Sequence, residues 1–369
     1  MPKAQETILE LQFDALTHNY NYIKSKLNPK TKFLAVVKAF AYGSDSIEVA
    51  KHLEILNVDY FAVAYTKEGA ALRDAGITTP ILVLHPQAVN FKEIIEHCLE
   101  PSIYSSNILK EFIRVAEQQQ QSNYPVHIKF NTGLNRLGFG RTDIDYIISH
   151  LKKTKAIVAK SLFSHLASSE DDNEKDFSIR QIEDFKTIAF DFKSKMNYKP
   201  WLHLCNTSGI LNYTEGHLDM VRCGIGLYGF GNSAKEDANL KPIATLKSII
   251  SQIHQIEKGE TVGYNRSHIA SSFEKIATIP IGHADGISRQ FGNGKGYVFV
   301  NNQKAAIIGN VCMDMIMVDI TDIDCKEGDE VIVFGNQTTA EKLSGAVDTI
   351  SYEILTAISQ RVTRVITRS

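Results

Sequence analysis

Residues that could do Schiff-base and acid–base chemistry recur where short apolar segments end in the first 230 residues. Lys38 follows the apolar segment 33–37, and a second lysine and a histidine close two later segments. An amine can form a Schiff base with an aldehyde, glycine-turn N–H groups and small hydroxyls can hold a phosphate, and an arginine can face a ring nitrogen or a carboxylate. Pyridoxal 5′-phosphate (PLP) meets all three demands. The polar residues at these ends are Lys38, Tyr42, Lys129, Asn131, Arg136, His165, Asn206, Thr207, Arg222, Gly224 and Gly226.

The segments that carry these residues alternate with helical patterns. Eight candidate strands read FLAVV, YFAVA, PILVL, PSIY, VHIKF, AKSLFSH, WLHLC and DMVRC. Continuous apolar strands separated by helices are typical of parallel sheets, because a crossover returns each strand parallel to the last. The pattern predicts a (β/α)8 TIM-like barrel, with an open doubly wound sheet as the alternative. In a barrel, the polar strand ends meet at the face where active sites lie.

The turn after Lys38 is followed by a helix-start signal. Asp45 and Glu48 have the spacing of an N-cap and its capping box, so we expect a helix to begin there. Lys38 is therefore predicted at the carboxyl end of a parallel strand, directly before a tight turn that contains Tyr42.

The chain changes character near residue 235. Beyond the polar stretch NSAKEDANLKP, segments such as GYVFVNN, KAAIIGNV, MIMVDI and DEVIVFG alternate with glycine-rich turns. These features predict a mainly antiparallel β domain. The expected division is a PLP-binding barrel over residues 1–234 and a C-terminal β domain over residues 235–369.

Bulk composition favours an enzyme that acts on small molecules. The 369 residues carry a formal net charge of -2, and no basic stripe interleaved with aromatics indicates nucleic acid or an anionic membrane. The five cysteines include no close CxxC pair, which argues against a disulfide framework and a zinc ribbon. We expect free thiols, no metal and, because no signal-like or membrane-spanning segment is visible, a cytoplasmic location.

Several motifs together identify a family resemblance. From about residue 5 to the C-terminus, the chain resembles alanine racemase in motif order and separation. The motifs are AVVKAFAYGSD, KFNTGLNRLGFG, SHLASSE, HLCNTSG, MVRCGIGLYG, VGYNRSH, GHADGISR, IGNVCMDMIMVD and SYEILTAISQRVTR. The resemblance implies a fold type III, PLP-dependent isomerase that interconverts L-alanine and D-alanine and supplies D-alanine for peptidoglycan.

The resemblance also implies residue roles at the cofactor. Lys38 matches the lysine that holds PLP, and Lys38 and Tyr264 match the acid–base pair on the two faces of Cα. Arg222 matches the arginine at the pyridine nitrogen, which leaves that nitrogen unprotonated and makes the ring a weaker electron sink. A shorter-lived carbanion suits a racemase. Further cofactor-binding matches are Tyr42, His165, Asn206, Thr207, Gly224, Ile225 and Tyr352.

Other matches concern the substrate and a second subunit. Arg136 and the Met313 N–H match groups that meet the substrate carboxylate, and Lys129 matches a lysine that is often carbamylated. In the family, Tyr264 and the segment with Cys312, Met313 and Asp314 reach the cofactor of the other subunit. The resemblance thus implies a homodimer whose active sites are shared between subunits.

The sequence departs from the family pattern near both substrate-facing regions. Asn131 stands where Asp is usual, Leu134 where Met is usual, and Glu170 where Asp is common, which changes the charge balance near Arg136. His283 replaces the usual Tyr and Asn310 the usual Arg in segments that line the substrate entrance. These two changes could alter access, pH response or amino-acid preference.

Other functions remain open at this point. A serine or broader-specificity racemase of the same fold is one alternative. Serine differs from alanine by one hydroxyl, and no motif in this sequence distinguishes the two substrates securely. A PLP-dependent decarboxylase should have an acidic partner at the ring nitrogen, where this chain has Arg222. A PLP-binding carrier would lack the β domain that contains Tyr264.

Overall fold

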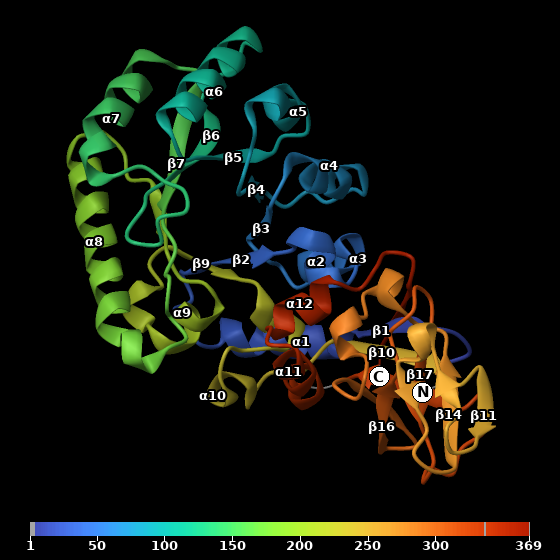
Figure 1. The fold of residues 1–369 in the computed structure, drawn as a ribbon. Helices are drawn as coiled ribbons and strands as arrows, with labels where there is room; N and C mark the ends of the chain where they lie inside the picture. Colours follow the sequence, from blue (N-terminus) through green and yellow to red (C-terminus); the bar gives the residue numbers. More distant parts are fainter. Residues whose placement is uncertain (1–3, 336, 369) are drawn as a thin grey trace.

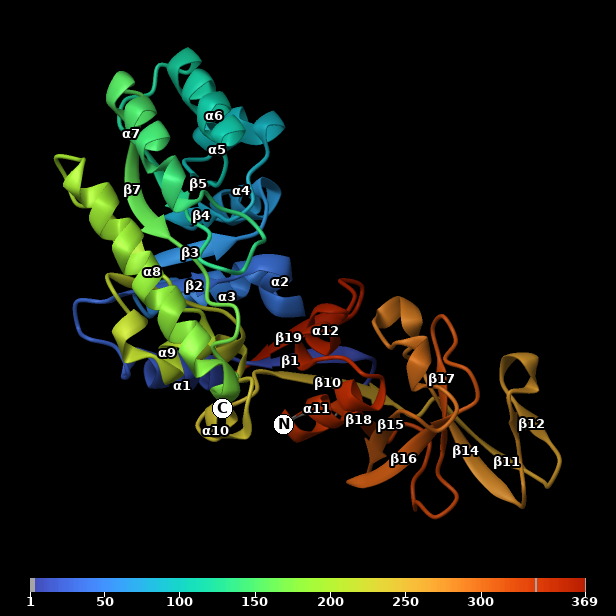
Figure 2. The same ribbon diagram turned by 60° about the vertical axis from the view of Figure 1, so that its left-hand side comes forward.

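The computed structural model describes residues 4–335 and 337–368 and contains a barrel and a separate β domain (Figures 1 and 2). The barrel is closed and parallel, and its first and last strands pair directly, with Leu34 opposite Arg222. This confirms the predicted barrel and excludes the open sheet. All eight predicted strands are present: β2 (Lys32–Val36), β3 (Tyr60–Val63), β4 (Ile81–Val83), β5 (Glu100–Ile103), β6 (Tyr124–Lys129), β7 (Ile157–Phe163), β8 (Trp201–His203) and β9 (Met220–Cys223).

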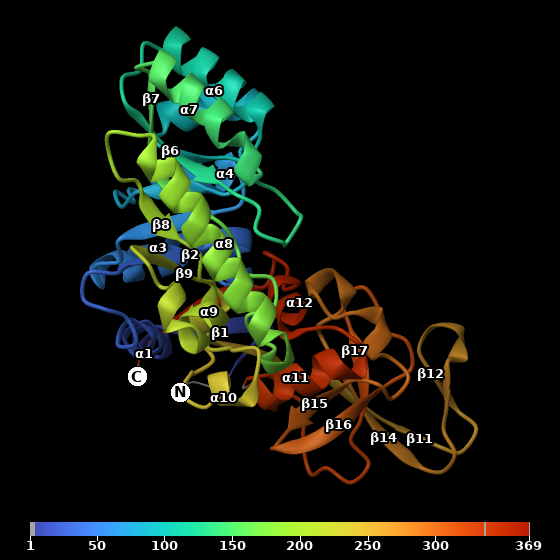
Figure 3. The same cartoon turned by 90° about the vertical axis from the view of Figure 1, so that its left-hand side faces the viewer.

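Amphipathic helices cover the outside of the barrel (Figure 3). In α6, the buried residues Ile108, Leu109, Phe112 and Ala116 recur at helical spacing and form one apolar stripe. Burial of such a stripe against the strands holds the helix in place. The helices are α1 (Phe13–Lys24), α3 (Ser46–Ile55), α4 (Thr66–Asp74), α5 (Phe91–Glu96), α6 (Ser106–Gln118), α7 (Ile144–Lys153), α8 (Lys175–Ser194) and α9 (Thr207–Asn212).

The β domain is built on a nine-stranded sheet in the order β11-β14-β17-β16-β15-β18-β10-β1-β19. Its pairs are antiparallel except β1 with β19, so the predicted mainly antiparallel domain is confirmed. The four segments quoted above are strands β15 to β18. The bounds are β1 (Ile8–Gln12), β10 (Ala244–Ile249), β11 (Gln252–Ile256), β14 (Glu274–Ile279), β15 (Tyr297–Val300), β16 (Gln303–Ile308), β17 (Ile316–Asp319), β18 (Glu330–Phe334) and β19 (Thr363–Thr367).

The chain passes between the two parts before and after the barrel strands. β1 precedes the barrel in sequence but pairs with β10 and β19 of the β domain. Glu10 on β1 and Lys247 on β10 form a buried ion pair at 2.8 Å. A two-stranded ribbon of β12 (Thr261–Val262) and β13 (His268–Ile269) projects from the β domain (Figure 2).

Three short helices lie outside the barrel repeat. α10 (Ala234–Asp237) follows the barrel, and α11 (Gln337–Ala346) and α12 (Ser351–Thr356) follow β18. α12 packs against the turn after β2, so a β-domain element borders the barrel's carboxyl face (Figure 1). Within the described ranges, none of the helices has the length and apolar character that a membrane crossing requires.

Candidate active site

A cavity of about 610 Å³ lies at the carboxyl ends of the barrel strands. Most of the predicted site residues border it, although they come from five strand ends and from α12. They are Lys38, Tyr42, Lys129, Arg136, His165, Asn206, Thr207, Arg222, Gly224, Ile225 and Tyr352. The fold therefore brings together the residues that the sequence separates by more than 300 positions.

The turn after Lys38 is a left-handed helical turn, α2 (Lys38–Gly43). Residues 39–42 have φ between 52° and 55°, a region that costs L-residues roughly 1–2 kcal/mol each. Distant groups hold the turn: the Glu68 carboxylate accepts the Ala39 N–H at 2.7 Å, and the Arg364 guanidinium donates to the Gly43 carbonyl at 2.8 Å. A Cβ on Gly43 would lie 2.0 Å from the Leu355 carbonyl oxygen of α12. The predicted helix start is confirmed, because Asp45 caps α3.

Two lysines in the cavity have depressed basicity. Burial, followed by repulsion from Arg136, lowers the pKa of Lys38. Burial, with repulsion from Arg136, Arg222 and Lys38, lowers the pKa of Lys129 to about 8. A lysine whose pKa falls offers more neutral amine near neutral pH, which is the form that attacks a carbonyl or removes a proton.

Arg222 is 4% exposed and is held by barrel-interior acceptors. Its Nη2 donates to the Ser164 carbonyl at 2.7 Å, to the Leu204 carbonyl at 2.9 Å and to His165 Nδ1 at 3.1 Å. Because a guanidinium only donates, His165 Nδ1 must be an acceptor. Burial and the positive charge of Arg222 hold the pKa of His165 well below its usual value.

Hydroxyls and backbone N–H groups converge on another wall of the cavity. Thr207 Oγ1 accepts the Gly224 and Gly226 N–H groups at 3.3 Å each. A Cβ on Gly224 would lie 2.2 Å from Tyr42 Oη, so only glycine lets the backbone approach the tyrosine this closely. Burial raises the pKa of Tyr352 to about 12 and also raises that of Tyr42. Both phenols therefore stay protonated as donors to an anion.

This donor set fits PLP. The hydroxyls and glycine N–H groups suit a phosphate, Arg222 suits a ring nitrogen, and Lys38 supplies an amine of lowered pKa. Asn206 supports the same wall, because its Oδ1 caps α9 by accepting the Gly209 N–H at 2.9 Å and the Ser169 hydroxyl at 2.8 Å.

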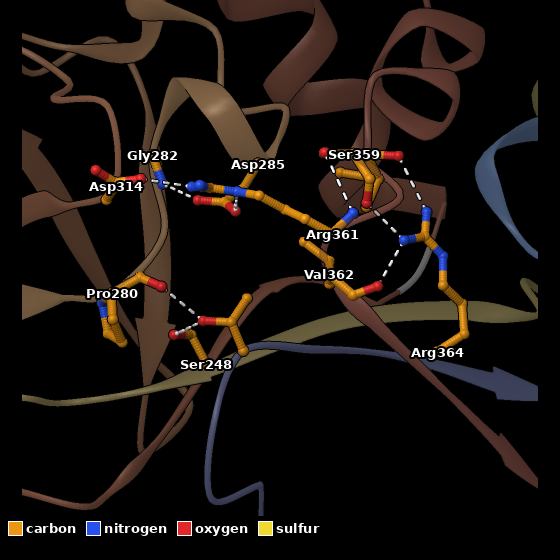
Figure 4. A network of polar contacts seen from close by, with 11 residues as sticks. Ser248, Pro280, Gly282, Asp285, Asp314, Ser359, Arg361, Val362 and Arg364 are labelled. Atoms are coloured by element: carbon orange, nitrogen blue, oxygen red, sulfur yellow. Dashed lines mark hydrogen bonds and ion pairs between the residues drawn. The ribbon is translucent and has the colours of Figure 1, made fainter.

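The remaining predicted residues lie on the β domain and do not border this cavity. Tyr264 and Met313 are 72% and 58% exposed. Cys312 precedes Met313 in the segment between β16 and β17. The Arg361 guanidinium forms ion pairs with Asp314 at 2.7 Å and with Asp285 at 2.6 Å (Figure 4). His283 lines a second cavity, of about 640 Å³, beside α12. One chain thus does not assemble the whole predicted set.

Two departures from the family pattern, Asn131 and Asn310, have local structural explanations. Asn131 Oδ1 accepts the Gly133 and Asn135 N–H groups at 3.2 and 2.9 Å, while its Nδ2 donates to Asn135 Oδ1 at 2.8 Å. The amide therefore organises the loop before Arg136 without adding charge. Asn310 Nδ2 donates to the Tyr264 carbonyl at 3.1 Å and supports the segment that carries this tyrosine. Leu134 and Glu170 have no such explanation.

Some cavity residues were not predicted. Tyr65 and His85 follow β3 and β4, so the strand-end rule could have found them. Leu137 and Asn232 lie in loops whose path the sequence does not reveal. The unpredicted lining residues are Val36, Ala64, Tyr65, Leu84, His85, Leu137 and Asn232.

Comparison with known proteins identifies the family of the chain. Residues 11–231 match the model of the alanine racemase N-terminal domain, and residues 243–366 match that of the C-terminal domain. Alanine racemase 1 of Caldanaerobacter subterraneus subsp. tengcongensis is 34% identical and covers 97% of this chain and 94% of its own length.

Two solved structures extend the similarity to the fold. The alanine racemase of Clostridium difficile 630 superposes with a TM-score of 0.93 at 35% identity, over 100% of this chain and 97% of its own. That of Bartonella henselae, which has covalently bound pyridoxal phosphate, gives a TM-score of 0.88 at 28% identity, over 99% and 100%. The chain belongs to the alanine racemase family, the PLP-dependent isomerases that interconvert L-alanine and D-alanine.

Proposed function

We propose that this chain racemises alanine with Lys38 and Tyr264 as the two acid–base groups, one on each face of the substrate Cα. Racemisation requires a proton to leave one face and another to arrive on the opposite face. Bound PLP supplies the electron sink that stabilises negative charge at Cα. The lowered pKa of Lys38 supports its role, because a neutral amine can take the proton.

The cofactor is held by residues of the cavity wall. Tyr42, Thr207, Gly224, Ile225 and Tyr352 would hold the phosphate, with Asn206 supporting that wall. Arg222 would donate an N–H to the ring nitrogen, and His165 would lie beside the ring. The converging hydroxyls and glycine N–H groups support this assignment.

The substrate carboxylate binds to Arg136 and to the Met313 N–H. Lys129 carries a carbamate, which would give Arg136 an anionic partner. The pKa of about 8 supports this, because a neutral amine is the form that captures CO2. Cys312 and Asp314 hold the Met313 segment, and His283 lines the substrate entrance.

The active form is a homodimer in which each site takes Tyr264 and Met313 from the partner subunit. The observation that carries this proposal is the separation of the predicted set into a buried cavity and an exposed β-domain face. Lys38 lines the cavity, whereas Tyr264 is 72% exposed. A second copy that covers this face would bury both exposed side chains and complete two equivalent sites.

The wider assignments follow from the family. The enzyme acts in the cytoplasm, where it supplies D-alanine for peptidoglycan. Residue 235 marks the passage from barrel to β domain, because β9 ends at Cys223 and β10 begins at Ala244. β1 is the segment of residues 1–234 that crosses to the β domain.

Subunit mixing tests the shared site. Lys38→Ala and Tyr264→Phe homodimers should each be nearly inactive. After subunit exchange, one site of each heterodimer has both lesions and the other has neither, so activity should return to about half per heterodimer by site counting. Verified exchange without recovered activity, or a fully active monomer by sedimentation, would reject the shared site. Borohydride reduction and peptide mapping should separately place the pyridoxyl group on Lys38.

A further inference from the structure

A chain of hydrogen bonds lies inside the barrel, on inward-facing side chains of five consecutive strands. None of its members is more than 6% exposed. One end is the guanidinium that borders the cavity and the other is a carboxylate. The members are Arg222 on β9, His203 on β8, Ser161 on β7, His127 on β6 and Glu100 on β5.

Each link has the length of a good hydrogen bond. Arg222 Nη1 lies 3.0 Å from His203 Nδ1, and His203 Nε2 lies 2.8 Å from Ser161 Oγ. Ser161 Oγ lies 2.6 Å from His127 Nδ1, and His127 Nε2 lies 2.7 Å from Glu100 Oε2.

Arg222 fixes the tautomer of His203, and a neutral His127 extends one donor direction along the whole chain. Arg222 only donates, so His203 Nδ1 accepts and the ring proton of His203 is on Nε2. His203 then donates to Ser161 Oγ. When His127 is neutral, the serine O–H donates to its Nδ1, and His127 donates its Nε2 proton to the Glu100 carboxylate. All donors point from the cavity toward Glu100.

The two ends of the hydrogen-bond chain carry opposite charges. Within the described residues, no carboxylate forms an ion pair with Arg222, and a buried charge without compensation is costly. The Glu100 carboxylate also accepts from Tyr60 at 3.0 Å and from Lys160 at 3.1 Å. Although burial raises its pKa, the bonds from His127 and Lys160 lower it overall, so Glu100 is an anion at neutral pH.

We propose that Glu100 is a positioning residue for the racemase reaction, because the ordered donor chain fixes the orientation and compensates the charge of Arg222. The hydrogen bonds that hold Arg222 among the described residues use Nη2 and one N–H of Nη1. The Nε–H and the second N–H of Nη1 are therefore the donors available to the cavity. A locked guanidinium presents these donors to the ring nitrogen with constant geometry. This inference rests on the proposed role of Arg222.

The proton order is tested first by ¹⁵N NMR of histidine-labelled protein, with and without bound PLP. His203 and His127 should both appear as neutral rings protonated on Nε2, with assignments made through Ser161→Ala. A proton on His203 Nδ1, or a doubly protonated His127, would overturn the ordered chain. This readout does not depend on turnover, so it separates failure of the chain from failure of the proposed function. Mapping of the pyridoxyl group to another lysine would mark the latter.

The functional consequence is tested with Glu100→Gln, which removes the charge but leaves an oxygen for His127. We expect kcat for alanine to fall about 10-fold, as for other residues that orient a functional group through its partner. The KM should change less than about 2-fold, since Glu100 does not border the cavity. The absorbance maximum of bound PLP should shift with the altered field at Arg222.

Two further variants keep this test decisive. Glu111→Gln removes the same formal charge from an exposed ion pair with Arg114 and should change none of these quantities. Ser161→Ala interrupts the chain without changing charge and should reproduce the loss in kcat, which covers the case that Glu100→Gln does not fold. Unaltered kcat and absorbance in a folded Glu100→Gln or Ser161→Ala protein would reject the positioning role.

Discussion

The barrel mouth and the exposed face of the β domain each carry part of one predicted residue set. The two regions differ in how far these residues are buried. At the barrel mouth, Arg222 is 4% and Lys129 7% exposed, and both lie among groups that shift or fix their charge. On the β domain, Tyr264 and Met313 extend from short connections and are mostly exposed. Because preorganised chemistry favours burial, this contrast is the reason for proposing that a partner subunit covers the second region.

The barrel half of the comparison makes the strongest prediction. Lys38→Ala should reduce racemisation in both directions by about 10⁴-fold or more, the upper end for a positioned acid or base, because it removes both the covalent attachment and one proton carrier. Initial rates from each enantiomer in a coupled assay measure this. Lys155→Ala, at an exposed lysine, is the control. More than a tenth of the wild-type rate in Lys38→Ala would remove Lys38 from the mechanism.

The β-domain half predicts a large but smaller effect. Tyr264→Phe should slow both directions by at least about 100-fold, the low end for an acid or base, since only one hydroxyl is lost. PLP absorbance should be retained, because the proposed cofactor contacts lie in the barrel cavity. Isotope exchange at Cα from one enantiomer should persist through Lys38. Equal rates in wild type and Tyr264→Phe would show that this face is not part of the site.

The two regions also differ in how much the sequence could reveal. The eight barrel strands were predictable because strands buried on both faces read as continuous apolar segments. The left-handed turn after Lys38 was not, because Ala39 and Ala41 have no local preference for positive φ. Contacts from Glu68 and Arg364, far away in sequence, impose that conformation.

Pairing between strands that are distant in the sequence also limited what could be predicted. β1 pairs with β10 across more than 230 residues, with Ile8 opposite Lys247, and no local pattern encodes that partner. The family motifs predict a role for Tyr264 from its sequence neighbours, although an exposed tyrosine on a β domain carries little signal alone. The strand-end rule would also have found His85, had it been applied to every strand.

The phosphate wall gives a more moderate prediction. Gly224→Ala would place a Cβ 2.2 Å from Tyr42 Oη, so the buried tyrosine must move. Overpacking of this kind costs about 1–3 kcal/mol, and we expect about 10-fold weaker PLP binding with little loss of fold. Absorbance titration of the cofactor-free protein measures the affinity. Gly345→Ala is the control, because nothing lies within 4 Å of the added Cβ, and it should leave the PLP affinity unchanged. An unchanged affinity in Gly224→Ala would contradict the proposed phosphate site.

The smallest expected effect concerns stability and tests the electrostatic side of the comparison. Without a carbamate, the Lys129 amine has a folded-state pKa of about 8, against 10.5 for the ordinary side chain. Between these pH values the unfolded chain binds more protons than the folded chain, so the free energy of unfolding should rise with pH. The full difference is on the order of 3 kcal/mol for a single lysine, at about 1.4 kcal/mol per pKa unit.

Lys129→Met should lack this rise in the free energy of unfolding. Urea unfolding of the cofactor-free protein in CO2-free buffer between pH 7 and pH 10.5 measures it, with Lys155→Met, at an exposed lysine, as the control. If wild type and Lys129→Met show the same slope, the barrel mouth does not hold Lys129 in the low-pKa state that its neutral amine chemistry requires.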